Sequence, residues 1–197
     1  MKNKIIIPLI AASAVFITGC ATDAHYVATG GTQNIVNVGQ INIQDYIQAA
    51  NTMTGELLAS GALDRVKNPP AILAISRIVN NTGKQIDTDL LVKKIRVALL
   101  QSGKAVTTTT FGLGGQAEDP LASGMQQKSD FLNDKNTTGK ADFSLSGKII
   151  QLNARAGNTT QATYSFQLSL NDTRTGYQVW EGEKEITKIG TRGTVGF

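Results

Sequence analysis

Two stretches near the end of the chain alternate strictly between apolar and polar residues. In 141–149 and 162–170, every second position holds Ala, Phe, Leu, Gly, Ile or Tyr, and the positions between hold Asp, Ser, Thr, Gln or Lys. A period of two predicts strands that bury one face. Gly157-Asn158 supplies turn residues between them, and a third strand is predicted over 177–186 after a turn at 172–176. The pattern therefore predicts an antiparallel meander.

Apolar residues recur every three or four positions in two earlier stretches. This spacing predicts one helix over 43–61 and a second within 87–103, where Asp87 is placed to cap the helix. Between them, after two prolines, 71–79 is almost continuously apolar, which is typical of a central strand buried on both faces. A Thr-rich strand is predicted over 105–111.

These elements predict an α+β fold: a small sandwich in which helices pack on one side of a mixed or antiparallel sheet. The globular domain is expected over 43–190, followed by a short C-terminal tail over 191–197. Within the domain, 111–140 is rich in Gly and polar residues and allows one short helix around 125–132.

The first 20 residues have the pattern of a lipoprotein signal. Lys2 and Lys4 precede an apolar run over 5–16, and Ile17-Thr18-Gly19 stands directly before Cys20. A dozen apolar residues are too few to span about 30 Å of hydrocarbon, so we expect 1–19 to be removed and Cys20 to be acylated. The alternative is an ordinary buried cysteine after an uncleaved signal anchor.

The segment 20–42 is predicted to be the lipidated N-terminus and a short flexible tether. It contains glycines, polar residues and the only histidine, His25, without a sustained apolar period. Residues 21–43 reach at most about 80 Å when extended and about 25–30 Å as a coil. Ala21 lacks the aspartate that often retains lipoproteins at the inner membrane. We therefore expect a lipid anchor on the periplasmic face of the outer membrane.

Charge and cysteine content exclude several classes of protein. Removing the 19 signal residues from the 197 leaves 178, and the loss of Lys2 and Lys4 leaves 17 basic against 15 acidic residues, a net charge of +2. No basic stripe indicates a nucleic-acid partner. With Cys20 acylated, no thiol remains for a disulfide, a zinc site or a Cys/His nucleophile, so neither a metal nor a cofactor is expected.

Two other motifs contain residue types found in catalytic or nucleotide-binding sites. Glu181, Glu183 and Glu185 share one strand face, which is typical of a solvated edge that discourages sheet pairing rather than of acid/base catalysis. Residues 112–117 match a dinucleotide-binding fingerprint, but Glu118-Asp119-Pro120 follows where a helix should continue. We therefore expect no nucleotide.

Several segments, in their order along the chain, resemble the LpoB family. They are Val79-Asn80-Asn81-Thr82 after a strand, Gly103-Lys104 closing an amphipathic helix, the alternating strand 141–149, and Thr175-Gly176-Tyr177-Gln178-Val179-Trp180-Glu181-Gly182. The resemblance spans about 43–188.

The resemblance implies a domain similar to the N-terminal domain of TolB, no catalytic activity, and a bifunctional penicillin-binding protein as the partner. The family's proteins are outer-membrane lipoproteins that activate these peptidoglycan synthases. Well-known members carry a long Pro-rich tether through the peptidoglycan layer, whereas 21–43 is short and contains no proline.

Candidate partner-binding residues are Arg77, Asn80, Asn81, Tyr177 and Trp180. Trp180 and Tyr177 are amphipathic aromatics of the kind found in binding hot spots, although an aromatic in a last strand is more often half-buried packing. The two asparagines first serve the turn after 71–79, through side-chain bonds to the backbone. Arg77 is either a paired structural group or an anchor for a partner.

Two other functions stay open from the sequence. A subunit of a curli-type secretion pore would insert amphipathic hairpins into a barrel, and 141–170 alternates as such strands do. Against this alternative, the sequence shows no second hairpin that could insert, and the strands within 141–170 are needed to complete the sheet. A carboxylate-dependent wall hydrolase is disfavoured because the acidic residues are scattered.

Overall fold

A computed structural model of the chain describes residues 24–111 and 141–191. Its elements in chain order are α1 (Ile43–Ala59), the short 3-10 helix η1 (Ala62–Arg65), β1 (Ala71–Asn81), α2 (Asp89–Gln101), β2 (Ala105–Phe111), β3 (Phe143–Ala156), β4 (Thr159–Asp172) and β5 (Gln178–Thr191). Within the described ranges, no helix combines the length and the apolar character needed to cross a membrane.

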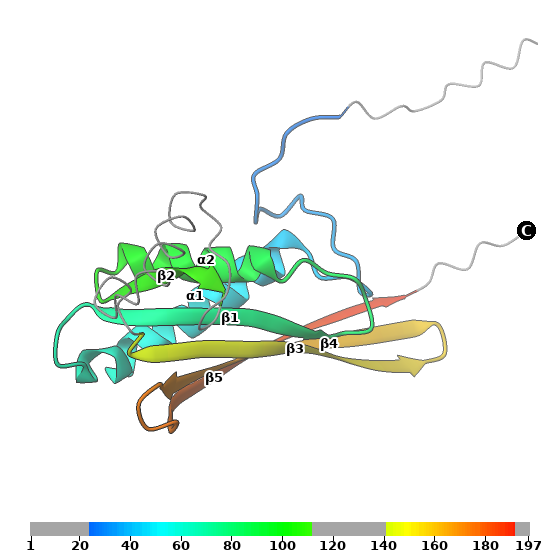
Figure 1. The fold of residues 1–197 in the computed structure, drawn as a ribbon. Helices are drawn as coiled ribbons and strands as arrows, with labels where there is room; N and C mark the ends of the chain where they lie inside the picture. The colour runs from blue at the N-terminus through cyan, green and yellow to red at the C-terminus, as the bar shows by residue number, and fades with distance from the viewer. Residues whose placement is uncertain (1–23, 112–140, 192–197) are drawn as a thin grey trace, which may run out of the picture.

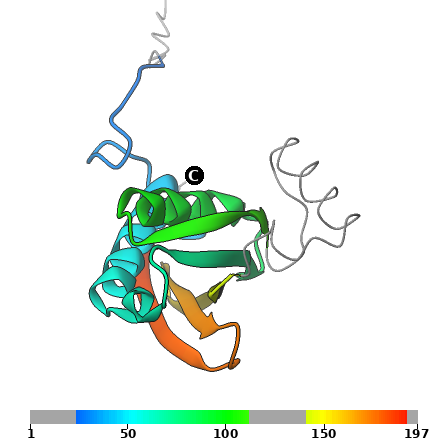
Figure 2. The same ribbon diagram turned by 60° about the vertical axis from the view of Figure 1, so that its left-hand side comes forward.

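The strands form one mixed sheet in the order β2-β1-β3-β4-β5. β1 runs parallel to β2 and β3, whereas β3, β4 and β5 are antiparallel neighbours. Both long helices cover the same face of the sheet (Figure 1), and the view in Figure 2 shows the opposite face without a helix. The predicted α+β fold with a mixed sheet is therefore confirmed.

The predicted meander is confirmed, but its strands are longer than predicted. β3 continues to Ala156 and β4 starts at Thr159, so the hairpin around Gly157 extends well past the alternating stretches. In this hairpin Leu152 is 64% exposed, because it points to the face of the sheet that no helix covers. Gly157 itself has φ +57°, as the predicted turn requires.

Both helices begin near their predicted starts, with different capping. Asn42 caps α1 in a reciprocal capping box with Asp45, a signal that the sequence reading did not use. The carboxylate of Asp87 accepts a hydrogen bond from the Asp89 amide at 2.9 Å, and α2 begins at Asp89 rather than at Asp87. Gly103, with φ +68°, follows the end of α2 as predicted.

The core lies between the helices and the covered face of the sheet. Phe166 of β4 is fully buried, and its ring meets that of Tyr46 edge-on, with centroids 6.2 Å apart and an interplanar angle of 75°. The largest fully buried side chains are Tyr164, Phe166, Met53, Leu57, Leu63, Leu73, Ile75, Leu91, Ile95, Leu99, Leu145 and Ile149. They come from both helices, η1 and the strands β1, β3 and β4.

We predict that the free energy of unfolding falls in alkaline solution because Tyr46 ionises. Burial, together with the charges of Asp87 and Asp45, raises the pKa of Tyr46 from 10.0 to about 12. Because the folded-state pKa is the higher one, this stabilisation is complete below pH 10 and is lost as pH rises from 10 to 12. Urea unfolding at pH 9 to 11 should show a steeper loss in the parent chain than in Tyr46→Phe. Equal slopes would contradict the assignment, and Tyr177→Phe is the exposed control.

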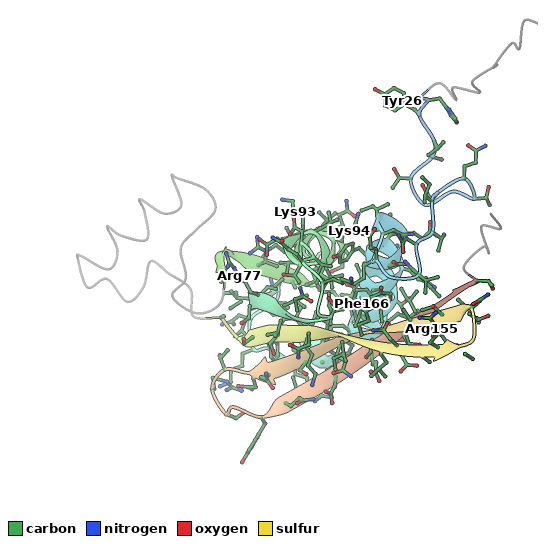
Figure 3. All side chains as sticks on the ribbon, turned by 90° about the vertical axis from the view of Figure 1, so that its right-hand side faces the viewer. Tyr26, Arg77, Lys93, Lys94, Arg155 and Phe166 are labelled. Atoms are coloured by element: carbon green, nitrogen blue, oxygen red, sulfur yellow. The ribbon has the colours of Figure 1, made fainter. Side chains whose placement is uncertain are left out.

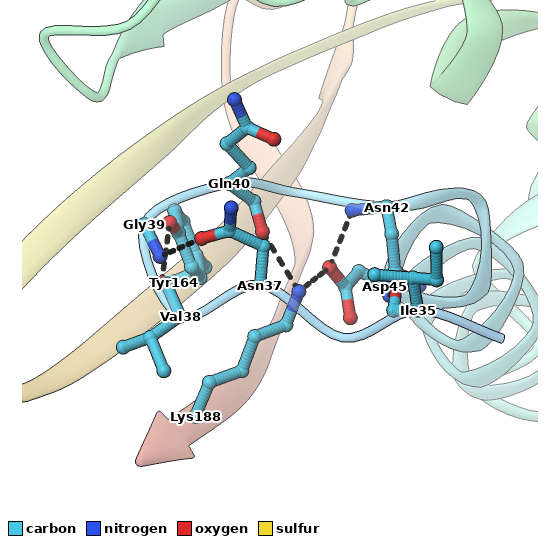
Figure 4. Close-up of polar contacts among 9 residues, drawn as sticks. All are labelled: Ile35, Asn37, Val38, Gly39, Gln40, Asn42, Asp45, Tyr164 and Lys188. Carbon is cyan, nitrogen blue, oxygen red and sulfur yellow. Dashed lines mark hydrogen bonds and ion pairs between the residues drawn. The ribbon is translucent and has the colours of Figure 1, made fainter. Parts of the chain in front are cut away.

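The end of the expected tether contacts the domain before Ile43 (Figure 4). The Tyr164 hydroxyl donates to the Val38 carbonyl at 3.0 Å, and the Lys188 ammonium donates to the Gln40 carbonyl at 2.8 Å. Lys188 also pairs with the Asp45 carboxylate, and both side chains are almost fully buried. The packed part of the chain therefore begins at about residue 37, ahead of the predicted domain start at Ile43.

Candidate interaction surface

The face of the sheet opposite the helices, called here the open face, is a mostly polar surface formed by β3, β4 and β5 (Figure 2). The alternation that buries one side of β3, β4 and β5 sends the other side outward. The strand registers place these residues on it: Ser144, Ser146, Lys148, Ile150, Leu152, Thr163, Ser165, Gln167, Ser169, Glu181, Glu183, Glu185, Thr187 and Ile189. Most of them carry hydroxyl, amide or carboxylate groups.

The three glutamates follow the edge strand β5, and each has a polar neighbour on β4. Glu181 lies opposite Ser169, Glu183 opposite Gln167, and Glu185 opposite Ser165. The position of β5 at the edge of the sheet agrees with the interpretation of this acidic row as a solvated edge.

Glu183 is held most firmly of the three. Gln167 Nε2 donates to Glu183 Oε1 at 2.7 Å, and the Ser165 hydroxyl donates to the same oxygen. These two hydrogen bonds, helped by the charge of Lys148, hold the pKa of Glu183 below its usual value. The carboxylate therefore stays ionised at neutral pH and keeps a fixed orientation, which suits it to receive a cationic group from a partner.

Asn80 and Asn81 occupy different faces of the end of β1. Asn80 Oδ1 accepts from the Thr82 amide at 3.0 Å, and its Nδ2 donates to the Lys84 carbonyl at 2.6 Å. The turn-building role predicted for Asn80 is thus present in the structure. Asn81 pairs with Ile150 of β3 and is exposed, so it borders the open face.

Arg77 lies where the pairing of β1 with β3 shifts register between Ile75 and Ile78, and its side chain is exposed (Figure 3). The extra residue in β1 is typical of a β-bulge, which redirects the side chains near it. The sequence pattern gave no sign of this irregularity, because 71–79 is almost uniformly apolar.

Tyr177 directly precedes β5 and Trp180 lies within it. The strands β3 and β4 therefore separate these two aromatics from Arg77, Asn80 and Asn81 on β1. Tyr177 is 74% exposed. Trp180 is half-buried and packs against the core, with its ring over Gly182, where an added Cβ would collide with it. The five candidate residues therefore do not form one patch, and Asn81 borders the open face through its pairing with Ile150.

A sequence model described as "Peptidoglycan-synthase activator LpoB" matches residues 45–186, which is most of the chain. The chain belongs to the LpoB family. A search of curated protein sequences finds no match.

Solved structures similar to this LpoB-family chain include two LpoB C-terminal domains. That from Escherichia coli is 17% identical, with a TM-score of 0.45, and the match covers 72% of this chain and 98% of that one. The domain from Salmonella enterica is 15% identical with the same TM-score and coverage. Lipoprotein GNA1162 from Neisseria meningitidis is 13% identical, with a TM-score of 0.41 over 64% of this chain and 88% of that one. The family assignment itself rests on the sequence model.

The polar neighbours of the glutamates are not among the site residues predicted from the sequence of this LpoB-family chain. Lys148, Ser165 and Gln167 occupy the polar half of the alternating pattern, so a signal was present. The alternating pattern locates the strands. It does not determine which residues of β3, β4 and β5 lie opposite one another, because that depends on the strand register.

Acidic residues and the histidine are the described residue types that commonly bind metal ions. Among residues 24–111 and 141–191, no group of three or more His, Cys, Asp and Glu could hold an ion. A cleft of about 460 Å³ near the start of β1 includes Arg65, Lys67, Asp142 and Asp172. The Asp142 carboxylate accepts from the Ile72 amide, and Asp172 pairs with Arg174 at 3.0 Å.

That internal pairing has an electrostatic effect of its own. Hydrogen bonds from Arg174 hold the pKa of Asp172 below its usual value, so this carboxylate remains charged and paired with Arg174.

Several sequence predictions concern residues outside the described ranges. They are Cys20, the fingerprint 112–117, Glu118-Asp119, the short helix expected around 125–132 and the tail after Thr191.

Proposed function

We propose that this LpoB-family chain is a lipid-anchored envelope protein that binds a bifunctional penicillin-binding protein and activates it without catalysing a reaction itself. The observation that carries the proposal is the family match over residues 45–186, which takes in both helices and most of the sheet. The family is one of peptidoglycan-synthase activators. The open face of the sheet also offers polar side chains to a partner.

Anchoring is proposed through Cys20. The signal pattern before it supports acylation, and the resemblance to outer-membrane lipoproteins supports attachment on the periplasmic face of that membrane. Under this proposal, residues 21–36 form the spacer and the packed domain starts at about residue 37. Because the spacer is short, the synthase domain that the chain contacts must extend toward the membrane in which the chain is anchored.

The anchor can be tested by Cys20→Ser. We expect this variant to remain an unprocessed precursor, because the thiol that receives the diacylglyceryl group is missing. Metabolic labelling with palmitate should mark the parent chain and leave the variant unlabelled. Incorporation of label into Cys20→Ser would show that the lipid, if any, is attached elsewhere.

For the partner we propose the open face of the sheet as the docking surface. Its charged row of Glu181, Glu183 and Glu185 favours a partner domain that presents Arg or Lys. Activation needs only that the domain prefer the active conformation of the synthase. A preference of about 1.4 kcal/mol would shift that equilibrium tenfold.

The docking surface is tested by reversing its charge. The triple substitution Glu181→Lys, Glu183→Lys and Glu185→Lys should weaken binding to the synthase at least about tenfold, since like charges then face each other. Glu56→Lys on the exposed side of α1 is the control, a single charge reversal away from the open face, and should bind as the parent does. Glu183→Lys alone, which should weaken binding, is its matched partner. Binding is measured with the purified periplasmic part of each bifunctional synthase of the same organism. Unchanged binding by the triple variant, or equal loss in the control, would contradict this surface.

The sheet pairing bears on the pore alternative. The strands of the 141–170 hairpin are paired with β1 on one side and β5 on the other over most of their length. These strands complete the sheet that carries the core, so inserting them into a barrel would require breaking that pairing.

A further inference from the structure

The outer side of the helix layer carries an apolar groove bordered by lysines. The groove lies between α1 and α2, has a volume of about 330 Å³, and is lined by residues that include Ile47, Leu90, Lys93, Lys94 and Val97. Val97 is 42% exposed, and none of the described residues lining the groove is acidic. Exposed aliphatic groups beside ammonium groups suit a surface that is both apolar and negatively charged.

The N-terminal segment leaves the domain on this same side. Residues 37–42 are held by Tyr164 and Lys188, and Asn42 Nδ2 donates to the Ile35 carbonyl at 3.4 Å. From there the segment rises above the helix layer in Figures 1 and 2. In Figure 3, Lys93 and Lys94 point to the side on which Tyr26 lies.

The spacer is short enough to keep the helix layer close to the anchor. The sixteen residues from 21 to 36 reach at most about 55 Å when extended and about 20–24 Å as a coil. Three apolar side chains in this segment are largely exposed to solvent, namely Tyr26, Ile35 and Val36. Such side chains gain from contact with the headgroup region of a bilayer.

We propose that the α1–α2 surface rests on anionic phospholipid headgroups of the membrane that holds Cys20. This inference rests on the lipid anchor of the proposed function. Lys93 and Lys94 contact the lipid phosphates, and Val97 with Leu100 faces the apolar boundary beneath them. The open face of the sheet then points away from the membrane and stays free for the synthase.

The test uses the full-length acylated lipoprotein in vesicles. Cys20 is the only cysteine of the sequence and carries the lipid, so Val97→Cys adds the one thiol that a fluorophore can label. Ser169→Cys on the open face is the matched control, and Gln101→Cys is a second probe in the groove. A nitroxide attached to lipid headgroups serves as quencher. Vesicles contain either phosphatidylglycerol with phosphatidylcholine or phosphatidylcholine alone.

In vesicles with phosphatidylglycerol, the probes at Val97→Cys and Gln101→Cys should be quenched about threefold more than the probe at Ser169→Cys. Adding Lys93→Gln and Lys94→Gln should lower the ratio of docked to undocked molecules about tenfold or more. Phosphatidylcholine alone should have a similar effect. Equal quenching at all three positions would overturn the proposal, and so would preferential protection of the groove probes by a synthase domain.

The anchor and the docking can fail separately. Mass spectrometry of the purified chain shows whether Cys20 is acylated, and an unacylated chain would refute the anchor and the membrane docking together. An acylated chain whose groove probes stay unquenched would refute the docking alone, and would leave the proposed activation of a synthase unaffected.

Discussion

Lys188→Met should lower the free energy of unfolding by about 3–5 kcal/mol. Lys188 and Asp45 form an ion pair in which both side chains are almost fully buried, with the Gln40 carbonyl as a second acceptor (Figure 4). Removing the ammonium leaves the Asp45 carboxylate buried without its counter-charge, and methionine fills a similar volume, so the loss reports the charge rather than a cavity.

The matched test is the double substitution Lys188→Met with Asp45→Asn. The amide is neutral and can still accept the hydrogen bond from the Asn42 backbone that caps α1. We therefore expect the double variant to regain a large part of the lost stability in urea unfolding. If the two substitutions simply add their costs, the buried pair is not what destabilises the single variant.

A second large loss is expected from Phe166→Ala, again about 3–5 kcal/mol. Phe166 is fully buried at mid-strand in β4, and the change would leave a cavity against the edge of Tyr46. For a domain whose total stability is about 5–15 kcal/mol, this loss comes close to unfolding it.

Ser169→Ala is the control for Phe166→Ala. It lies on the same strand but on the open face, with one long 3.4 Å hydrogen bond to Glu181, and should change stability by less than about 0.5 kcal/mol. Ser165 is less suitable, because it is buried and donates to Glu183. Equal losses from Phe166→Ala and Ser169→Ala would contradict the assignment of faces in β4.

The elements of the fold were predictable because local patterns determine them. Alternation in 141–149 and 162–170 and helical spacing after Ile43 gave the strands and α1, and Gly103 marked the end of α2. The strand ends beyond Ile149 were not predictable, since strands that extend past the core have no apolar period to mark them.

The candidate surface was less predictable, because it depends on contacts between distant parts of the chain. The pair between Asp45 and Lys188 joins residues 143 positions apart, and neither residue stands out within its own element. The bulge near Arg77 and the neighbours of Glu183 likewise depend on strand register. Family resemblance indicated the function without locating the surface.

The two faces of the domain divide the proposed roles. The helix side carries the departing N-terminal segment and the lysines of α2, whereas the open face carries an ordered row of carboxylates on β5. A lipid anchor on one side and a protein partner on the other would allow the chain to hold a synthase near the membrane without competition between the two contacts.

The most direct test of the central claim is the rate of glycan polymerisation by each purified bifunctional penicillin-binding protein of the same organism, measured with and without the folded chain. Activation through a preference of about 1.4 kcal/mol for the active conformation predicts a rise in rate of up to about tenfold for at least one synthase. The triple charge-reversal variant should give little or no rise. Unchanged rates for every synthase at saturating concentrations of the chain would contradict the proposal that it is an activator.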